Sequence, residues 1–261
     1  MGDPRSAERV EGPPLVSIVL ATFNERLNLP EVVDRIQRLA LPPYELLVAD
    51  DGSTDGTREY LRELATRDQR VRLLFHDGKQ TTLRAQCQAI EAAAGRYVIV
   101  MDADLQHPPE TIPALLRELE SGAVLAVASR YAAGGSAGPR TLSRLAISRG
   151  AEWTAKAFLP AARGVTDPVS GFFGLRRDVW VPLNPLYRGY KLLLFALVMA
   201  EGRRIAEVGY RFEPRAGGLS KVTEGPAFVR VFLVEVILAK RLESLLREGC
   251  RPFPAVAEPT R

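Results

Sequence analysis

Five short apolar runs, each followed by a polar or helical stretch, occupy residues 15–129 of this 261-residue chain. They predict β-strands at 16–21, 45–49, 71–75, 97–101 and 124–128, with amphipathic helices between them. Strands that are apolar on both faces are typical of a parallel sheet covered by helices on each side. We therefore expect an α/β fold with a mostly parallel sheet, in which ligands bind beyond the carboxyl ends of the strands.

Polar side chains gather where these predicted strands end. They are Asn24 and Glu25 after the first strand, Asp50 and Asp51 after the second, Asp102 and Asp104 after the fourth, and Arg130 after the fifth. Because the carboxyl ends of parallel strands meet at one edge of a sheet, we expect these side chains to share a cleft.

The segment Asp102-Ala103-Asp104 places two carboxylates directly after a buried strand, with Gln106 just beyond. In an extended segment, alternate side chains point the same way, so three oxygen donors would face one spot. Such a donor set suits Mg²⁺ or Mn²⁺ that also binds phosphate oxygens of a substrate. A solvated turn is the alternative, and the position after a buried strand favours the metal site.

Two further motifs each have a structural and a functional interpretation. Asp51 would accept hydrogen bonds from a nucleotide base or ribose, whereas Ser53 or Thr54 would cap the following helix. The glycine-rich segment 131–140 precedes Arg144 and Arg149, and a second basic group lies further on. These residues form either a linker with a solvated basic face or a mobile loop beside arginines that bind phosphates.

Composition narrows the function classes. A net charge of +4 suits phosphate-bearing partners or an anionic membrane surface and is too small to indicate nucleic acid. With 2 cysteines, a disulfide framework and a Cys-based zinc site are excluded, and 2 histidines far apart in the sequence disfavour a His-rich metalloenzyme. A dinucleotide-binding glycine motif, a P-loop and a nucleophile elbow are also missing from their required contexts.

Residues 15–225 form the predicted main domain, flanked by tails at 1–14 and 250–261 that we expect to be flexible. Residues 226–249 are predicted to form an amphipathic helix whose apolar side packs on the domain, forms a dimer seam or contacts a membrane. The apolar run 192–200 is shorter than the roughly 20 residues of a membrane span, and a secretory signal is missing. We therefore expect a cytoplasmic protein without a transmembrane domain.

Taken together, the motifs resemble those of the dolichyl-phosphate (polyprenyl-phosphate) mannose synthases, which are inverting glycosyltransferases with a GT-A fold. The resemblance runs from about residue 16 to 221. Its most specific pieces are DADLQHPPE at 102–110, SRY at 129–131 and DPVSGFF at 167–173, and GYK at 189–191 supports them.

The resemblance implies a role for particular residues. The nucleotide pocket would be lined by Ala21, Phe23, Glu25, Ala49 and Asp51. The donor diphosphate would meet Asp102, Ala103 and Asp104, and the metal would be bound by Asp102, Asp104 and Gln106. Donor or acceptor phosphates would be held by Arg130, Lys191, Arg215 and Lys221, and the lipid phosphate by Arg144 and Ser148. Asp104, Arg130 and Arg215 would be the catalytic residues.

The reaction so implied moves mannose from GDP-mannose to dolichyl or polyprenyl phosphate, with inversion and with Mg²⁺ or Mn²⁺ as cofactor. The sequence departs from the family at Ala21 and Phe23, where Pro and Tyr are usual, and at Phe195, where an acid is common. UDP-glucose or another hexose donor is the alternative, and a non-catalytic nucleotide-sugar-binding subunit is the rival class. We expect peripheral binding at the cytoplasmic face of a membrane, either directly or through a membrane-embedded partner.

Overall fold

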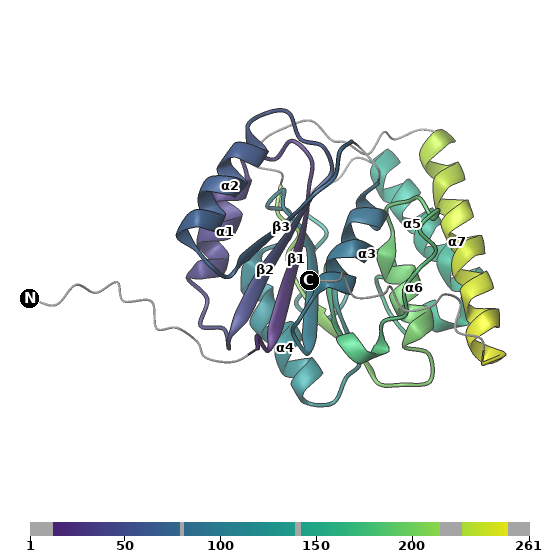
Figure 1. Cartoon of the computed structure of the whole chain (residues 1–261). Helices are drawn as coiled ribbons and strands as arrows, with labels where there is room; N and C mark the ends of the chain where they lie inside the picture. The colour runs from purple at the N-terminus through teal and green to yellow at the C-terminus, as the bar shows by residue number, and fades with distance from the viewer. Residues whose placement is uncertain (1–12, 79–80, 139–141, 215–225, 250–261) are drawn as a thin grey trace, which may run out of the picture.

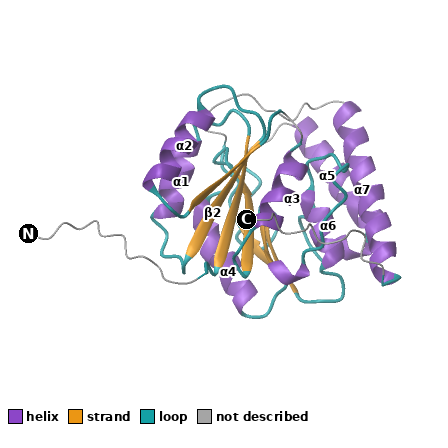
Figure 2. Cartoon of the chain, viewed as in Figure 1, coloured by secondary structure: helices purple, strands orange, loops and turns teal. Residues whose placement is uncertain are grey.

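The computed structural model describes residues 13–78, 81–138, 142–214 and 226–249. Within them the chain builds a seven-stranded sheet in the order β3-β2-β1-β4-β6-β5-β7. Figure 2 shows its strands in orange, with helices on both sides. The strands are β1 (Val16–Thr22), β2 (Tyr44–Asp50), β3 (Val71–Phe75), β4 (Tyr97–Asp102), β5 (Leu125–Ser129), β6 (Phe173–Arg176) and β7 (Ile205–Gly209). The helices are α1 (Leu29–Gln37), α2 (Thr57–Arg67), α3 (Thr82–Ala92), α4 (Ile112–Glu120), α5 (Leu142–Phe158), α6 (Leu192–Met199) and α7 (Pro226–Arg247).

Most of the sheet is parallel, as predicted. β1 pairs in parallel with β2 and β4, and β2 pairs in parallel with β3. β6 runs antiparallel to both of its neighbours, β4 and β5, and β7 is parallel to β5. All strands except β6 therefore run in one direction, so that their carboxyl ends and the amino end of β6 meet at the same edge.

Successive side chains of the central strands pack into two separate cores. In β1, Ile18 and Leu20 belong to the core that α1, α2 and α4 cover, whereas Val19 belongs to the core on the opposite face. Helices α3, α5, α6 and α7 contribute to that second core. Figure 1 shows α1 and α2 on one side of the sheet and α3, α6 and α7 on the other. This alternation follows from the two-residue period of a strand.

The apolar run in the last third of the chain is a core element. Every residue of α6 is buried, and the helix packs between the sheet and α7. Among the described residues, none of the helices is both long and apolar enough to span a membrane.

Helix α7 runs over Pro226–Arg247, within the range 226–249 expected for it, and it is apolar on two sides. Phe232, Val236 and Ala239 are buried in the core that α6 shares. Leu233 and Ile237 lie outside that core, with 44% and 66% of their surface exposed. Packing on the domain therefore accounts for only one side of the helix.

Candidate active site

The loops after β1 and β2 are joined by hydrogen bonds. Asn24 has a φ of 54°, in the left-handed region that few residues other than glycine adopt. Its N–H donates to Oγ of Ser53 (2.8 Å), and its Oδ1 accepts from the N–H of Thr54 (2.9 Å). The N–H of Glu25 donates to Oγ1 of Thr57 (3.0 Å). Glu25 is therefore held at the edge where the first two strands end.

Of the two adjacent acids after β2, the first has a structural role. Asp50 is fully buried and accepts hydrogen bonds from the Ser53 N–H (3.0 Å) and from Nε of Arg58 (2.6 Å). Burial alone would raise the pKa of Asp50, but these hydrogen bonds hold it below its usual value. Asp51 lies 3.6 Å from Nδ1 of His76, a buried nitrogen that has no hydrogen-bond partner among the described residues. The expected contact with a nucleotide therefore rests on Asp51.

The segment after β4 is a turn, so the extended conformation expected for 102–106 is wrong. The strand ends at Asp102, and Leu105 has a φ of 65°. The N–H of Gln106 donates to Oδ1 of Asp104 (3.1 Å), which closes the turn. Strand geometry therefore does not place Gln106 beside the two carboxylates, and its role as a metal ligand stays a prediction.

His107 stabilises this turn through a hydrogen bond with its first residue. Its Nδ1 accepts a hydrogen bond from the N–H of Asp102 (3.1 Å), and its ring stacks on Phe172 with centroids 5.3 Å apart. Tyr210 and Phe212 contact the same ring edge-on. Burial lowers the pKa of His107 to about 4, so that the imidazole is neutral at neutral pH. The residue therefore positions Asp102 and does not form an ion pair with it.

Arg130, directly after β5, is paired with an acid from the loop before β6. Its Nε and one terminal nitrogen each lie 2.7 Å from a different carboxylate oxygen of Asp167. Asp167 is fully buried, and only 11% of the Arg130 side chain is exposed. Burial opposes the charge, but the hydrogen bonds and charge of Asp167 raise the pKa of Arg130 above its usual value. Arg130 is thus a permanent, oriented cation at the edge of the sheet.

Lys191, at the start of α6, adds a second cation to the same place. Its Nζ donates to the carbonyl oxygen of Val169 (3.0 Å), in the loop before β6. Burial and the nearby charge of Arg130 lower the pKa of Lys191, whereas Asp102 and Asp167 act in the opposite direction. The ends of β4 and β5, the loop before β6 and the start of α6 therefore bring Asp102, Arg130 and Lys191 together.

The other predicted site residues lie near the end of β1, in the cores, on α5 or outside the described residues. Ala21 and Phe23 are half-buried near the end of β1, whereas Ala49 and Ala103 are buried in the two cores. Ser148 lies on α5, 3.4 Å from the hydroxyl of Tyr131. Arg144 lies on the same helix, and its side chain is outside the described part. Arg215 and Lys221 are outside the described residues altogether.

The glycine-rich segment, expected to be either a linker or a mobile loop, is packed against β7 in its described part. The N–H of Ser136 donates to the carbonyl of Tyr210 (2.9 Å), and the N–H of Phe212 donates to the carbonyl of Ser136 (2.8 Å). A methyl group at Gly209 would overlap the carbonyl oxygen of Ala133. Residues 131–138, which follow Arg130 directly, are therefore held against the end of β7 by backbone hydrogen bonds.

Two residues of the site had no role assigned from the sequence. Asp167 and His107 both lie within the motifs that carried the resemblance, yet neither was given a function. The signal for Asp167 is weak: it lies between Thr166 and Pro168, and only its complete burial in the fold shows that it requires a cationic partner. His107 offers no such signal, because its contact with Asp102 depends on the turn.

Asp102 and Asp104 fit a divalent cation that also binds substrate oxygens. A methyl group at Gly171 would lie 3.1 Å from both Oδ2 of Asp102 and Cε1 of His107, so the glycine keeps space beside the carboxylate. Among the described residues, there is no group of three or more His, Cys, Asp and Glu side chains that could hold a metal. Two carboxylates at one turn, the first of them beside Gly171, suit Mg²⁺ or Mn²⁺ whose remaining ligands come from a diphosphate.

One cavity in the described part of the chain lies away from these charges. It has a volume of about 820 Å³ and is lined by Leu15, Arg96, Arg177 and Trp180, among others. These residues lie at or near the amino ends of β1 and β4 and the carboxyl end of β6. The cavity is therefore at the opposite edge of the sheet from the assembled charges.

Comparison with known proteins identifies the class. The model of glycosyl transferase family 2 matches residues 17–180, more than half of the chain. The chain therefore belongs to glycosyl transferase family 2. Its fold resembles solved structures of glucosyl-3-phosphoglycerate synthase from Mycobacterium tuberculosis. One of these, in complex with Mn²⁺, UDP-glucose and phosphoglyceric acid, has a TM-score of 0.64 and 22% identity over 92% of this chain and 81% of that one.

Curated relatives narrow the resemblance within the family. A dolichol-phosphate mannosyltransferase from Pyrococcus furiosus is 39% identical over 79% of this chain, which spans 59% of the relative's length. The Saccharomyces cerevisiae protein of the same name is 33% identical over 79% of this chain and 80% of its own length. A polyprenol monophosphomannose synthase from Mycolicibacterium smegmatis is also 33% identical, with the same coverage. The resemblance to this group, and the GT-A type of fold, are confirmed.

Proposed function

We propose that this chain transfers mannose from GDP-mannose to a dolichyl or polyprenyl phosphate. The observation that carries the proposal is the meeting of two carboxylates, Asp102 and Asp104, with two cations, Arg130 and Lys191, at the carboxyl edge of a family-2 glycosyltransferase sheet. The names of the curated relatives support the choice of mannose and of a polyprenyl phosphate acceptor.

The chemistry of the acceptor explains why a general base is unnecessary. A phosphate monoester has a second pKa near about 6, so its oxygen is already largely anionic at neutral pH. The difficulty of the reaction is that this anion must approach a donor diphosphate that is also anionic. Arg130 and Lys191 offset that repulsion, and Asp167 keeps the Arg130 guanidinium in a fixed orientation. Attack on the face opposite the departing diphosphate inverts the anomeric centre.

The proposed cofactor is Mg²⁺ or Mn²⁺, held by Asp102 and Asp104 together with diphosphate oxygens. When bound, such an ion neutralises the negative charge of the leaving diphosphate. The chain's own part is to hold the two carboxylates in place, through the turn at Leu105 and the support of His107.

A lipid acceptor requires contact with a membrane, and the exposed side of α7 is suited to it. Val229, Leu233, Val234 and Ile237 are between 44% and 66% exposed on that helix. Trp153 on α5, a helix in contact with α7, is 78% exposed. We infer peripheral binding at the cytoplasmic face of the membrane through these two helices, assisted by the positive net charge.

Calorimetry and a transfer assay test the proposal together. GDP-mannose and UDP-glucose are titrated with and without Mn²⁺, and transfer to polyprenyl phosphate is then measured with the donor that binds. We expect metal-dependent binding and transfer with GDP-mannose. Transfer with UDP-glucose alone would contradict the choice of donor, and donor binding without any transfer would favour a nucleotide-sugar-binding subunit.

A further inference from the structure

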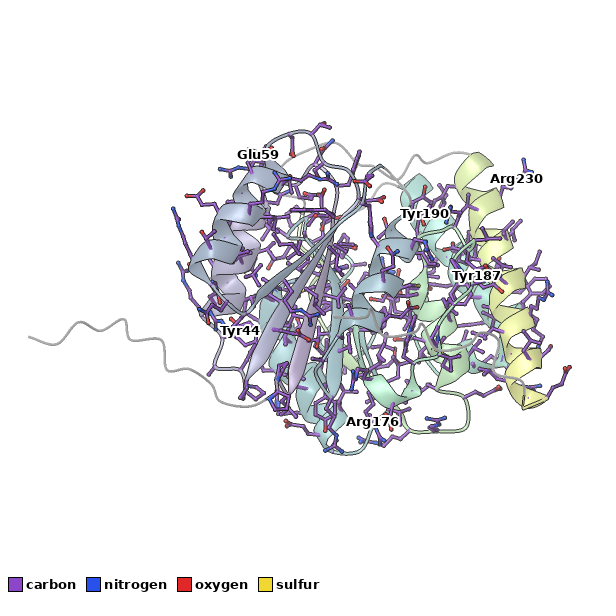
Figure 3. All side chains as sticks on the ribbon, viewed as in Figure 1. Tyr44, Glu59, Arg176, Tyr187, Tyr190 and Arg230 are labelled. Carbon is purple, nitrogen blue, oxygen red and sulfur yellow. The ribbon has the colours of Figure 1, made fainter. Side chains whose placement is uncertain are left out.

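One buried acid on α7 contacts the backbone of the turn that carries Lys191. Oε1 of Glu235 accepts hydrogen bonds from the N–H groups of Tyr190 (2.5 Å) and Lys191 (2.7 Å). Glu235 is 1% exposed, although the faces of α7 on either side of it carry exposed apolar residues. Tyr190, which Figure 3 labels, also packs its ring near that of Phe228 on α7, with centroids 6.3 Å apart.

The contact supplies a carboxylate acceptor, which the start of α6 itself lacks. Lys191 is the N-cap residue of this helix, it makes no side-chain capping hydrogen bond, and the first turn contains no acid. The exposed N–H groups at a helix N-terminus need acceptors, and a carboxylate there is favourable. Phe195, which follows on the same helix, is fully buried and apolar, so it offers no acceptor for these N–H groups either. Glu235, 44 positions away in the sequence, therefore supplies a carboxylate at the N-terminus of α6, where it accepts from the N–H of the N-cap residue.

The turn is also shaped to fit this carboxylate. A methyl group at Gly189 would overlap Oε1 of Glu235, so only glycine allows the carboxylate to reach both N–H groups. The carbonyl of Gly189 accepts from the N–H of Leu83 (3.1 Å), which fixes the other side of the turn to α3. From this turn the side chain of Lys191 extends to the carbonyl of Val169 (3.0 Å).

We propose that Glu235 is a positioning residue, which holds the Gly189–Lys191 turn so that Lys191 points to the donor diphosphate. The inference rests on the proposed function, because it requires Lys191 to contact that diphosphate. The carboxylate of Glu235 also acts on the charge of Lys191. Burial and Arg130 lower the pKa of Lys191, whereas Asp102, Glu235 and Asp167 act in the opposite direction. Helix α7 therefore contributes to the site without touching the substrate.

The full chain offers a matched control for the test. Glu243 lies on the same helix, about 12 Å further along, and is also 1% exposed. Its carboxylate accepts from Lys240 (2.5 Å) and Arg247 (2.8 Å), which lie on the same helix. Removing Glu243 therefore weakens α7 without affecting the Lys191 turn.

The experiment measures the affinity for GDP with Mn²⁺ by calorimetry, and the melting temperature, for each variant. We expect Glu235→Ala to weaken GDP binding roughly tenfold, since charge-assisted hydrogen bonds are lost. Glu235→Gln keeps an oxygen acceptor and should recover most of that affinity. Glu243→Ala should lower the melting temperature and leave GDP affinity as in the wild type.

One further variant, Lys191→Ala, keeps the inference separable from the proposed function. Lys191→Ala should weaken GDP binding at least as much as Glu235→Ala. Wild-type GDP affinity in Lys191→Ala would overturn the inference, whereas only the transfer assay decides the proposed function. If Lys191→Ala weakens binding but Glu235→Ala does not, only the positioning role is wrong. Equal loss in Glu235→Ala and Glu243→Ala, or in Glu235→Gln and Glu235→Ala, would also overturn it.

Gly189→Ala provides the test if Glu235→Ala does not fold. The added methyl group would overlap Oε1 of Glu235 and push the carboxylate away from the turn. GDP binding should therefore weaken while Glu235 is present. In the Glu235→Gln background the obstruction remains, and the loss should be similar. Wild-type GDP affinity in Gly189→Ala would overturn the inference.

Discussion

Replacing Asp167 by asparagine tests the account of the buried cation most directly. In the wild type, both oxygens of Asp167 accept from Arg130 at 2.7 Å, and one of them also accepts from the Arg130 N–H at 3.2 Å. The amide of asparagine has the same shape but only one oxygen. Its NH₂ group would face a donor of the guanidinium, and Arg130 would remain buried without a counter-charge.

The size of the effect follows from the burial of the pair. Removing one partner of a buried ion pair destabilises a protein by about 3–5 kcal/mol. The carboxylate of Asp167 is fully buried and the Arg130 side chain is 11% exposed, so solvent can screen little of this loss. For a chain of this size, the loss corresponds to a fall of roughly 6–20 °C in the melting temperature.

A matched pair elsewhere in the same chain provides the control. Arg176 and Asp178 form a similar two-pronged contact, but their side chains are 33% and 61% exposed. An exposed pair of this kind contributes about 0–1 kcal/mol. Urea unfolding of Asp167→Asn and Asp178→Asn should therefore give clearly different free energies of unfolding. Equal losses in the two variants would refute the argument that burial makes the Arg130 pair important.

Three further outcomes are expected. Asp104→Ala should abolish transfer and the dependence of donor binding on Mn²⁺, because a carboxylate ligand is lost; calorimetry checks the binding, and full activity in excess chelator would exclude the metal. Flotation with anionic liposomes should decrease as salt rises, and Ile237→Glu should reduce it at every salt concentration. Although burial opposes it, hydrogen bonds from Ser17, Ala94 and Arg72 lower the pKa of Glu45, so its stabilising contribution is present above about pH 4.3 and lost below it. Urea midpoints measured against pH should therefore change less in Glu45→Gln.

The sequence was sufficient for the part of the sheet whose strands are long and apolar. β1, β2, β4 and β5 consist mostly of buried residues, β3 is an apolar run that is only partly buried, and the predicted bounds of all five agree with the structure to within one residue. β6 has four residues and β7 is only half-buried, so neither has an apolar run long enough to stand out. Gly174 in β6 lies against Ile99 of β4, where a methyl group would come within 2.6 Å, and a glycine in a strand weakens the sequence signal further.

Within the site, the sequence located the strand ends but not the pairing of side chains. Asp50 and Asp51 are adjacent acids, and only the hydrogen bonds of Asp50 with Ser53 and Arg58 show which one is structural. The contacts of Asp167 with Arg130 and of Glu235 with Lys191 join residues that are far apart in the chain. Such contacts depend on tertiary packing, which no local pattern encodes.

The reversed strand β6 explains how these distant residues reach one edge. Because β6 runs opposite to β4 and β5, its amino end lies beside their carboxyl ends. The loop before β6 therefore delivers Asp167 to Arg130, Gly171 to Asp102, and the carbonyl of Val169 to Lys191. In a parallel arrangement that loop would lie at the other edge. A single antiparallel strand thus converts a row of separate strand ends into a site where acids and cations have fixed partners.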